Sequence, residues 1–433
     1  MSQSAPTWDD RGPEILNTTG DLSGVGAASF NRLVGRIFEN EALKEYLRDT
    51  AKGETGLVSQ DAFVEFCTKA MNAFYAETSR DADHQQEKAR LDAYIGKTNA
   101  VGMRFHTANK PDPNAIYWPD PQRGDPLLKD VLPIVGRVPI IDQSTVISSA
   151  GSCFAIEIAR NLMSRGFNYL CLENTFDLET RTLVMGSDPQ NPEVQYSCRW
   201  GILFNTPSFT QIVENAFGVR PLPQILIDLQ LRDSKYYIDP FREAVMFPSP
   251  EAYSIEREKH LANTREVFLK SEVFVMTLGL NEAWRLLPDG PYISRNPRNA
   301  ALTGLLDHRT LTVAENVDYL QRFIDVVRAH NPNLKIIVTV SPVPLMATGR
   351  ADKYHVIAAN THSKSVLRIA AEEIVERNDG VYYFPSYEVV TVCSPESWTE
   401  DQRHIHPDAV ARVMKAFDAM FLTNAAKTLS KLG

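Results

Sequence analysis

The arrangement of strand-like and helix-like segments most narrowly limits the folds open to this 433-residue chain. Four short apolar runs are typical of buried strands, at Thr145–Ala150, Val273–Leu278, Lys335–Val340 and Val381–Phe384. Helical apolar spacing near residues 154, 256, 315 and 355 alternates with them. Such alternation predicts a parallel sheet with helices on both faces. Binding sites in these sheets lie beyond the carboxyl ends of the strands, where Ser152, Asn281 and Ser341 all fall.

The first strand gives way to a helix at Gly151-Ser152-Cys153-Phe154. A serine at such a junction has its hydroxyl beside unbonded backbone N–H groups and the positive end of the helix dipole. Those donors can hold a developing oxyanion, which makes Ser152 a candidate nucleophile. A simple helix cap is the alternative for Ser152. Cys153 is a second candidate nucleophile, although cysteine is often only a small buried apolar residue.

A second polar segment lies near the C-terminus, where Asp401 and His404 form an Asp-x-x-His pair. This spacing lets the carboxylate bind one imidazole nitrogen and leaves the other to take a proton from a serine. Pro407 predicts a helix directly afterwards, which would hold the pair against the core. His406 competes for the role of base; the three-residue offset favours His404 and leaves His406 on the substrate side. A solvated polar loop is the alternative for the whole segment.

A third segment, Gly279-Leu280-Asn281-Glu282, follows the second predicted strand. The Asn281 amide is a candidate oxyanion donor, and Glu282 is a candidate to orient it. Glu282, Trp284 and Ser341 are also candidate substrate-side residues. An ordinary turn with a capping Asn and a core Trp is the alternative.

Three segments together resemble the GSCFA family of the SGNH (GDSL-like) hydrolase superfamily: Gly151-Ser152-Cys153-Phe154-Ala155, residues 277–284 and residues 400–404. The resemblance covers roughly residues 140–425 and implies a three-layer α/β/α, flavodoxin-like domain. It implies Ser152 as nucleophile, with His404 and Asp401 completing a catalytic triad.

The same resemblance implies an oxyanion hole built from Ser152, Asn281 and a residue of a further block. Residues 200–207 resemble that block, and they offer Gly201 or Asn205 without deciding between them. We expect Gly201 in the oxyanion hole and Asn205 on the substrate side.

Composition outside these segments predicts the domain organisation. Residues 1–24 form a loose tail, 25–106 a helical N-terminal region, 107–139 a Pro-rich connector and 140–425 the catalytic domain, with a tail over 426–433. The stretch 168–255 is too long for a simple crossover and predicts an insertion or a lid.

Charge and cysteine content exclude several classes of protein. The formal net charge of −9 argues against nucleic-acid binding. The first residues lack the pattern of a signal peptide, and no apolar run reaches the length of a membrane span. The five cysteines are scattered, which argues against a disulfide framework and a zinc site; they are Cys67, Cys153, Cys171, Cys198 and Cys393. A cytoplasmic protein is expected.

The candidate nucleophile, base and orienting carboxylate predict a serine-dependent esterase or deacylase that needs neither a metal nor an organic cofactor. The family resemblance implies an acylated glycan or small ester as its substrate. The family's association with bacterial glycan synthesis implies an O-acyltransferase as one alternative. A non-catalytic scaffold or binding protein that retains the fold is another. The N-terminal helical region offers a surface for a homo-oligomer or a protein partner.

Overall fold

The computed structural model describes residues 115–423, apart from residues 232–233, 288, 295–301, 303 and 395. The predicted tail over 1–24, the helical region over 25–106 and the tail over 426–433 lie outside the described residues, as does the start of the connector. The described part of the connector contains two short 3-10 helices, η2 (Pro121–Arg123) and η3 (Leu128–Asp130). Its later residues dock on the C-terminal helix, where the Val138 N–H donates to the Met420 carbonyl at 2.8 Å.

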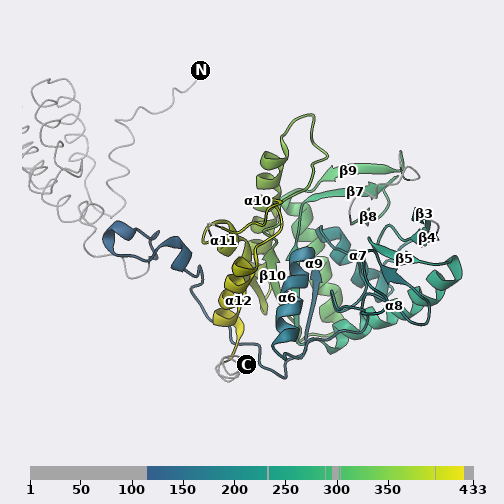
Figure 1. The fold of residues 1–433 in the computed structure, drawn as a ribbon, viewed down its shortest axis with the longest axis horizontal. Helices are drawn as coiled ribbons and strands as arrows, with labels where there is room; N and C mark the ends of the chain where they lie inside the picture. Colours follow the sequence, from purple (N-terminus) through teal and green to yellow (C-terminus); the bar gives the residue numbers. More distant parts are fainter. Residues whose placement is uncertain are drawn as a thin grey trace, which may run out of the picture. The chain divides into compact units, whose positions relative to one another are not determined.

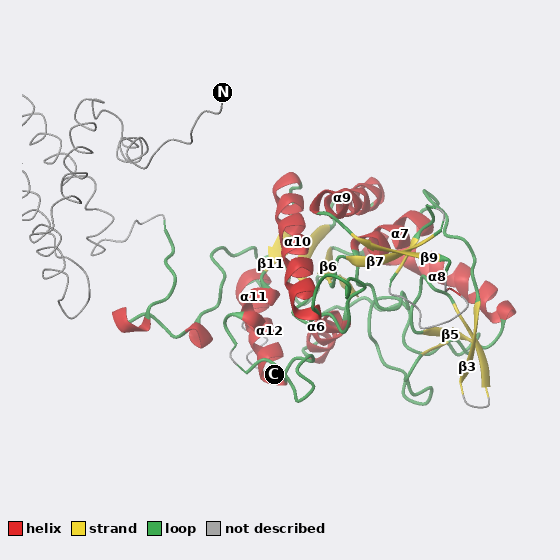
Figure 2. Cartoon of the chain, turned by 90° about the horizontal axis from the view of Figure 1, so that it is seen from above, coloured by secondary structure: helices red, strands yellow, loops and turns green. Residues whose placement is uncertain are grey.

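Within the described residues, four parallel strands form the central sheet in the order β1-β6-β10-β11 (Figures 1 and 2). The strands are β1 (Ile147–Gly151), β6 (Val273–Leu278), β10 (Lys335–Val340) and β11 (Val381–Phe384). All three pairings are parallel. The four strands expected from the sequence are therefore confirmed, with β1 beginning slightly later than predicted.

Alternate residues of each strand enter two separate cores, as the period of a pleated strand requires. In β6, Phe274 and Met276 join the core on one face, whereas Val273 and Val275 join the core on the other. Helices α7 (Thr206–Ala216), α8 (Pro250–Lys270), α9 (Val313–His330) and α10 (Val356–Arg377) cover the first face. Helices α6 (Cys153–Ser164), α11 (Ser386–Thr391) and α12 (Pro407–Phe421) cover the second. The predicted three-layer α/β/α architecture is confirmed.

Two helices on the second face, one from the start of the described domain and one from its end, pack against each other. Figure 1 shows α6 and α12 side by side, and Arg165 at the end of α6 pairs with Asp418 of α12 at 2.8 Å. The predicted helix after Pro407 is thus confirmed, and it packs next to the helix that follows Ser152.

Two small antiparallel sheets were not anticipated from the sequence. One has the order β2-β5-β4-β3 and is built from β2 (Leu183–Val184), β3 (Ile227–Leu231), β4 (Ser234–Ile238) and β5 (Val245–Phe247). Figure 2 shows β3 and β5 at one end of the domain, far from β11. The other has the order β8-β7-β9 and is built from β7 (Glu282–Leu286), β8 (Tyr292–Ile293) and β9 (Leu306–Thr310).

Among the described helices, none is both long enough and apolar enough to cross a bilayer.

The packing of α12 on β11 gives a prediction about stability. Phe417 is fully buried, and its ring centroid lies 5.3 Å from that of Phe384. Replacing a buried Phe by Ala leaves a cavity, so we expect Phe417→Ala to lower the free energy of unfolding by about 3–5 kcal/mol. Urea unfolding measures this, with exposed Lys415→Ala on the same helix as the control. A Phe417→Ala protein as stable as the control would contradict this account of the core.

Candidate active site

A cavity of about 680 Å³ lies at the carboxyl ends of β1, β6 and β10. Each of the three strands contributes a lining residue just beyond its end, namely Ser152, Gly279 and Ser341. The remaining walls come from other parts of the chain: Cys153, Ile202, Phe204, Leu280, Glu282, Trp284, His308, residues 343–349, Arg403 and His404. Among the described residues of the stretch 168–255, predicted as an insertion or lid, only Ile202 and Phe204 line the cavity.

Ser152 is buried, with 3% of its surface exposed, between β1 and α6. It occupies the N-cap position, but its side chain makes no capping hydrogen bond, so the capping interpretation is wrong. Its Oγ donates instead to the Ser341 Oγ at 3.0 Å. The residue before Ser152 is packed closely against β6, because a Cβ on Gly151 would lie 2.6 Å from the Thr277 carbonyl oxygen. The serine hydroxyl is therefore held at the cavity wall rather than used by the helix.

Asp401 and His404 form a pair on a loop at the same cavity. The Asp401 Oδ2 is hydrogen-bonded to the His404 Nδ1, and its Oδ1 accepts from the backbone N–H groups of His404 at 2.9 Å and Arg403 at 3.0 Å. These backbone N–H groups, first that of His404, hold the pKa of the Asp401 carboxyl well below its usual range. Because a carboxylate only accepts, Nδ1 carries a proton, and in the neutral ring Nε2 is then the acceptor. The His404 side chain is 59% exposed.

His406, the competing candidate for the base, does not line the cavity of Ser152. It is the N-cap of α12, where its Nδ1 accepts from the Asp408 N–H at 3.3 Å. It lines a separate hollow with Trp398 and Arg412 rather than the cavity of Ser152.

Asn281 lies directly behind the cavity. Its amide Nδ2 donates to the Leu311 carbonyl at 2.9 Å, and its backbone N–H donates to the Ser363 Oγ at 2.8 Å. These bonds fix the loop between β6 and β7, whose neighbouring residues Gly279 and Leu280 line the cavity. The bond to Leu311 uses one of the two N–H donors of Nδ2, and an oxyanion role for the amide stays a prediction.

Gly201 and Asn205 flank the residues of their segment that reach the cavity, which are Ile202 and Phe204. Asn205 caps α7, with its Oδ1 accepting from the Ser208 N–H at 3.0 Å. Gly201 has a φ of +75°, and a Cβ there would lie 2.4 Å from a backbone oxygen. Both residues thus shape the loop that carries the lining residues.

A second imidazole–carboxylate pair, which sequence reasoning missed, also lines the cavity. The Glu282 Oε2 lies 3.1 Å from the His308 Nε2 and accepts from the Gly349 N–H at 2.8 Å. Trp284 lies beside it, with its ring centroid 5.2 Å from that of His308. His308 stands opposite Trp284 on the neighbouring strand β9. No short motif signals such a pairing, because it depends on how β7 and β9 align.

Lys364, also missed, is buried behind the cavity with only 2% of its surface exposed. Its Nζ donates to the Gly279 carbonyl at 2.6 Å and to the Val343 carbonyl at 2.8 Å. Both of these residues line the cavity, so one side chain of α10 ties two walls together. Burial lowers the pKa of Lys364 to about 7.

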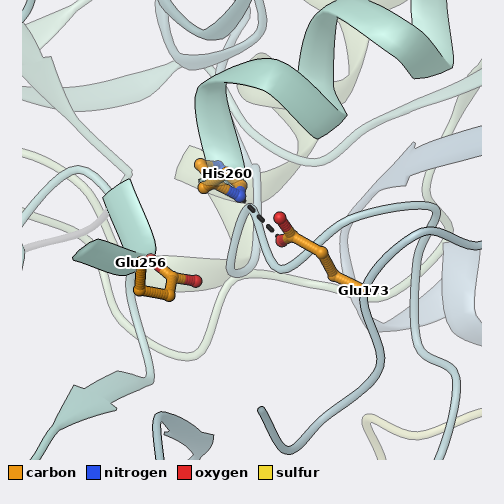
Figure 3. Close-up of side chains that lie close together, drawn as sticks. All are labelled: Glu173, Glu256 and His260. Atoms are coloured by element: carbon orange, nitrogen blue, oxygen red, sulfur yellow. Dashed lines mark hydrogen bonds and ion pairs between the residues drawn. The ribbon is translucent and has the colours of Figure 1, made fainter. Parts of the chain in front are cut away.

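A buried ionic cluster supports the loop that precedes Ile202. Glu173, Glu256 and His260 place their ligand atoms within 4.8 Å of one another, which would suit a metal ion (Figure 3). Glu256, however, is already bound by Arg242 at 2.8 Å and Arg199 at 3.2 Å. A cation would have to displace two guanidinium groups, so these residues form an ion-pair network.

The network also fixes the position of the backbone near Arg199. The Arg242 Nε donates to the Arg199 carbonyl at 3.1 Å, and the Arg199 N–H donates to the Glu173 Oε2 at 2.9 Å. His260 is directed at the same Glu173 carboxylate, with Nδ1 2.7 Å from Oε2 (Figure 3). The chain is therefore held immediately before Gly201 and Ile202.

Comparison with known proteins identifies one matching sequence family. The model described as the GSCFA family matches residues 146–417. No curated protein sequence matches the chain.

Several solved structures share remote similarity with the chain. A carbohydrate esterase family 3 from Talaromyces cellulolyticus has 12% identity and a TM-score of 0.28, covering 67% of this chain and 99% of its own. A family 3 carbohydrate esterase from Clostridium thermocellum has 11% identity and a TM-score of 0.29, covering 67% and 98%. A putative GDSL-like lipase from Parabacteroides merdae has 13% identity and a TM-score of 0.27, covering 65% and 98%. Likenesses this remote assign no activity to this chain.

The burial of Lys364 predicts how stability changes with pH. A folded-state pKa of about 7, against an ordinary 10.5, means that the folded protein binds fewer protons than the unfolded chain between these values. Stability therefore rises with pH across this window, by up to about 1.4 kcal/mol per pH unit from this one group. Below pH 7 the whole penalty of the buried charge is present.

Lys364→Met removes the titrating group. We expect wild type to become more stable relative to Lys364→Met as the pH rises from 7 to 9.5. Urea unfolding of both proteins measures the difference between their free energies of unfolding. Lys353→Met, at an exposed position, is the control and keeps the wild-type profile. Parallel profiles for wild type and Lys364→Met would rule out the shifted amine.

Proposed function

Because this chain belongs to the GSCFA family, whose model spans residues 146–417, we propose that it is a serine hydrolase of ester bonds that works through Ser152, His404 and Asp401. The observation that carries the proposal is that Ser152 and His404 line one cavity, with Asp401 bonded to the Nδ1 of the histidine. Nucleophile, base and orienting carboxylate are thus available around one space, which is the arrangement that acyl transfer to a serine requires.

In the first half of the proposed reaction, the Ser152 Oγ attacks the acyl carbonyl while the His404 Nε2 takes its proton. The C–O bond to the alcohol then breaks, and His404 returns the proton to the leaving oxygen. Asp401 keeps its charge throughout and stabilises the imidazolium that forms between these steps. The low pKa of its carboxyl suits this role.

The negative charge on the carbonyl oxygen needs donors near Ser152. This residue lies at the N-terminus of α6, where backbone N–H groups are directed out of the helix, although the Ala155 N–H already donates to the Ser152 carbonyl at 2.9 Å. The helix dipole adds to their effect. Ser341 is a further candidate donor, because its Oγ lies 3.0 Å from the Ser152 Oγ and accepts in that bond, so its own proton is not used there.

In the second half, water attacks the acyl-enzyme and His404 acts again as base, then returns the proton to Ser152. The acid leaves and the free enzyme is restored. A cavity of about 680 Å³ is within the ordinary range for a small ligand, and we propose an acylated glycan or small ester as the substrate class.

Removing the nucleophile tests the first step. We expect Ser152→Ala to lower kcat/KM for p-nitrophenyl acetate by at least about 10³-fold, because the acyl-enzyme cannot form. A fluorophosphonate probe should label wild type and not Ser152→Ala. Labelling that persists in this variant and disappears in Cys153→Ser would assign the nucleophile to Cys153. Labelling of wild type without turnover would favour acyl transfer to a hydroxyl acceptor over hydrolysis.

Neutralising the orienting carboxylate tests the base. Asp401→Asn no longer stabilises the imidazolium or fixes the tautomer of His404, so we expect kcat to fall by about 10²–10⁴-fold with little change in KM. The matched control is Asp408→Asn, which removes the carboxylate beside His406 at 3.5 Å. A large loss in Asp408→Asn with none in Asp401→Asn would make His406 the base.

A further inference from the structure

The cavity contains a second carboxylate–imidazole pair whose position suits binding rather than bond breaking. We propose that His308, oriented by Glu282, accepts a hydrogen bond from a hydroxyl group of the substrate, so that the preferred substrates are esters of polyhydroxy alcohols such as sugars. The inference rests on the proposed function, since it concerns the specificity of the same cavity.

The first step is the protonation state of the pair. Glu282 is 1% exposed, and both of its oxygens are occupied, Oε1 by the Thr348 hydroxyl at 2.6 Å and Oε2 by the His308 Nε2 at 3.1 Å. Burial raises the pKa of the Glu282 carboxyl, but the bonds from His308 and Thr348 outweigh it and hold the pKa below the ordinary value. The carboxylate is ionised and only accepts, so the His308 Nε2 carries the proton.

The second step is the other ring nitrogen. In a neutral imidazole with its proton on Nε2, Nδ1 is an acceptor. The side chain of His308 is 24% exposed and lines the cavity. In its neutral form His308 therefore offers the hydrogen-bond acceptor Nδ1 to a ligand, and an O–H or N–H group of the ligand would donate to it.

The third step is rigidity. A Cβ on Gly349 would lie 2.5 Å from the His308 Nε2, so glycine lets this loop cover the ring without displacing it. On the opposite strand, Trp284 lies with its centroid 5.2 Å from the imidazole at an interplanar angle of 59°. A ring held by a carboxylate, a loop and an indole needs no ordering when a ligand binds.

The fourth step is the chemistry of the neighbouring wall. Trp284 lines the cavity beside His308 and presents an apolar aromatic surface next to a fixed acceptor. A sugar ring matches this combination, because it carries C–H groups on its faces and O–H groups on its edge. Simple aryl and alkyl esters match only the apolar part.

The experiment compares two esters in variants of one residue. His308→Phe keeps a planar ring but removes the acceptor, whereas His308→Asn places a carbonyl oxygen near the position of Nδ1. We expect His308→Phe to lower kcat/KM for 6-O-acetylglucose, relative to that for p-nitrophenyl acetate, by roughly ten- to a hundredfold, mainly through KM. His308→Asn should recover part of this ratio.

The control variant is His355→Asn, at a histidine outside the cavity that caps α10. Its ratio of kcat/KM values should equal that of wild type. A ratio that is also unchanged in His308→Phe, or an equal loss on both esters that His308→Asn does not relieve, would overturn the proposal and leave His308 with a structural role.

A comparison on wild type alone covers the case in which His308→Phe does not fold. The probe is 6-O-acetylglucose with its remaining hydroxyls methylated, which keeps the ring but lacks O–H donors. We expect a tenfold or greater loss of kcat/KM on methylation, and equal values would overturn the proposal. Failure of the proposed function is distinct: wild type and Ser152→Ala would then cleave p-nitrophenyl acetate equally, whatever residue stands at 308.

Discussion

Gly151 of β1 pairs with Thr277 of β6, and Thr277 pairs in turn with Thr339 of β10, so three parallel strands end at the same level of the sheet. The geometry of the candidate site depends on this register. The Ser341 N–H extends the ladder by donating to the Leu278 carbonyl at 2.7 Å. As a result, the hydroxyls of Ser152 and Ser341 come within 3.0 Å although 189 residues separate them in the chain. A slip of one residue in either pairing would turn alternate side chains to the opposite face and separate the two hydroxyls.

Buried charged groups hold the loops that leave this sheet edge. Lys364 bonds two loop carbonyls, and the Arg242–Glu256 pair holds the backbone at Arg199. A buried ion pair adds little net stability compared with well-packed apolar side chains. What these groups contribute is a defined position for loop backbone that lacks a strand or helix partner, because every buried carbonyl and N–H must find one.

The sequence predicts the parts of the site that local patterns encode. The strand-to-helix junction at Ser152 and the Asp-x-x-His spacing of Asp401 and His404 follow from short-range geometry, and the structure brings Ser152 and His404 to one cavity. The Glu282–His308 pair depends on the register of β7 and β9, and the bonds of Lys364 depend on how α10 packs. Neither arrangement produces a recognisable pattern in the local sequence. Asn281 shows the opposite case: the local sequence marks its amide as an oxyanion donor, and it does not show that one of the two N–H donors binds Leu311.

The two halves of the candidate triad are held in different ways, and this has a consequence for how they meet. Ser152 is fixed by the sheet and the first turn of α6. Within the described part of the chain, Asp401 accepts its hydrogen bonds from Thr399, Arg403 and His404, which belong to its own loop. The pair therefore keeps its tautomer if the loop shifts, because the groups that set the tautomer move together. The half-exposed imidazole of the proposed base can therefore approach the fixed hydroxyl of the proposed nucleophile as a ligand fills the cavity, and catalytic hydrogen bonds commonly tighten only at that stage.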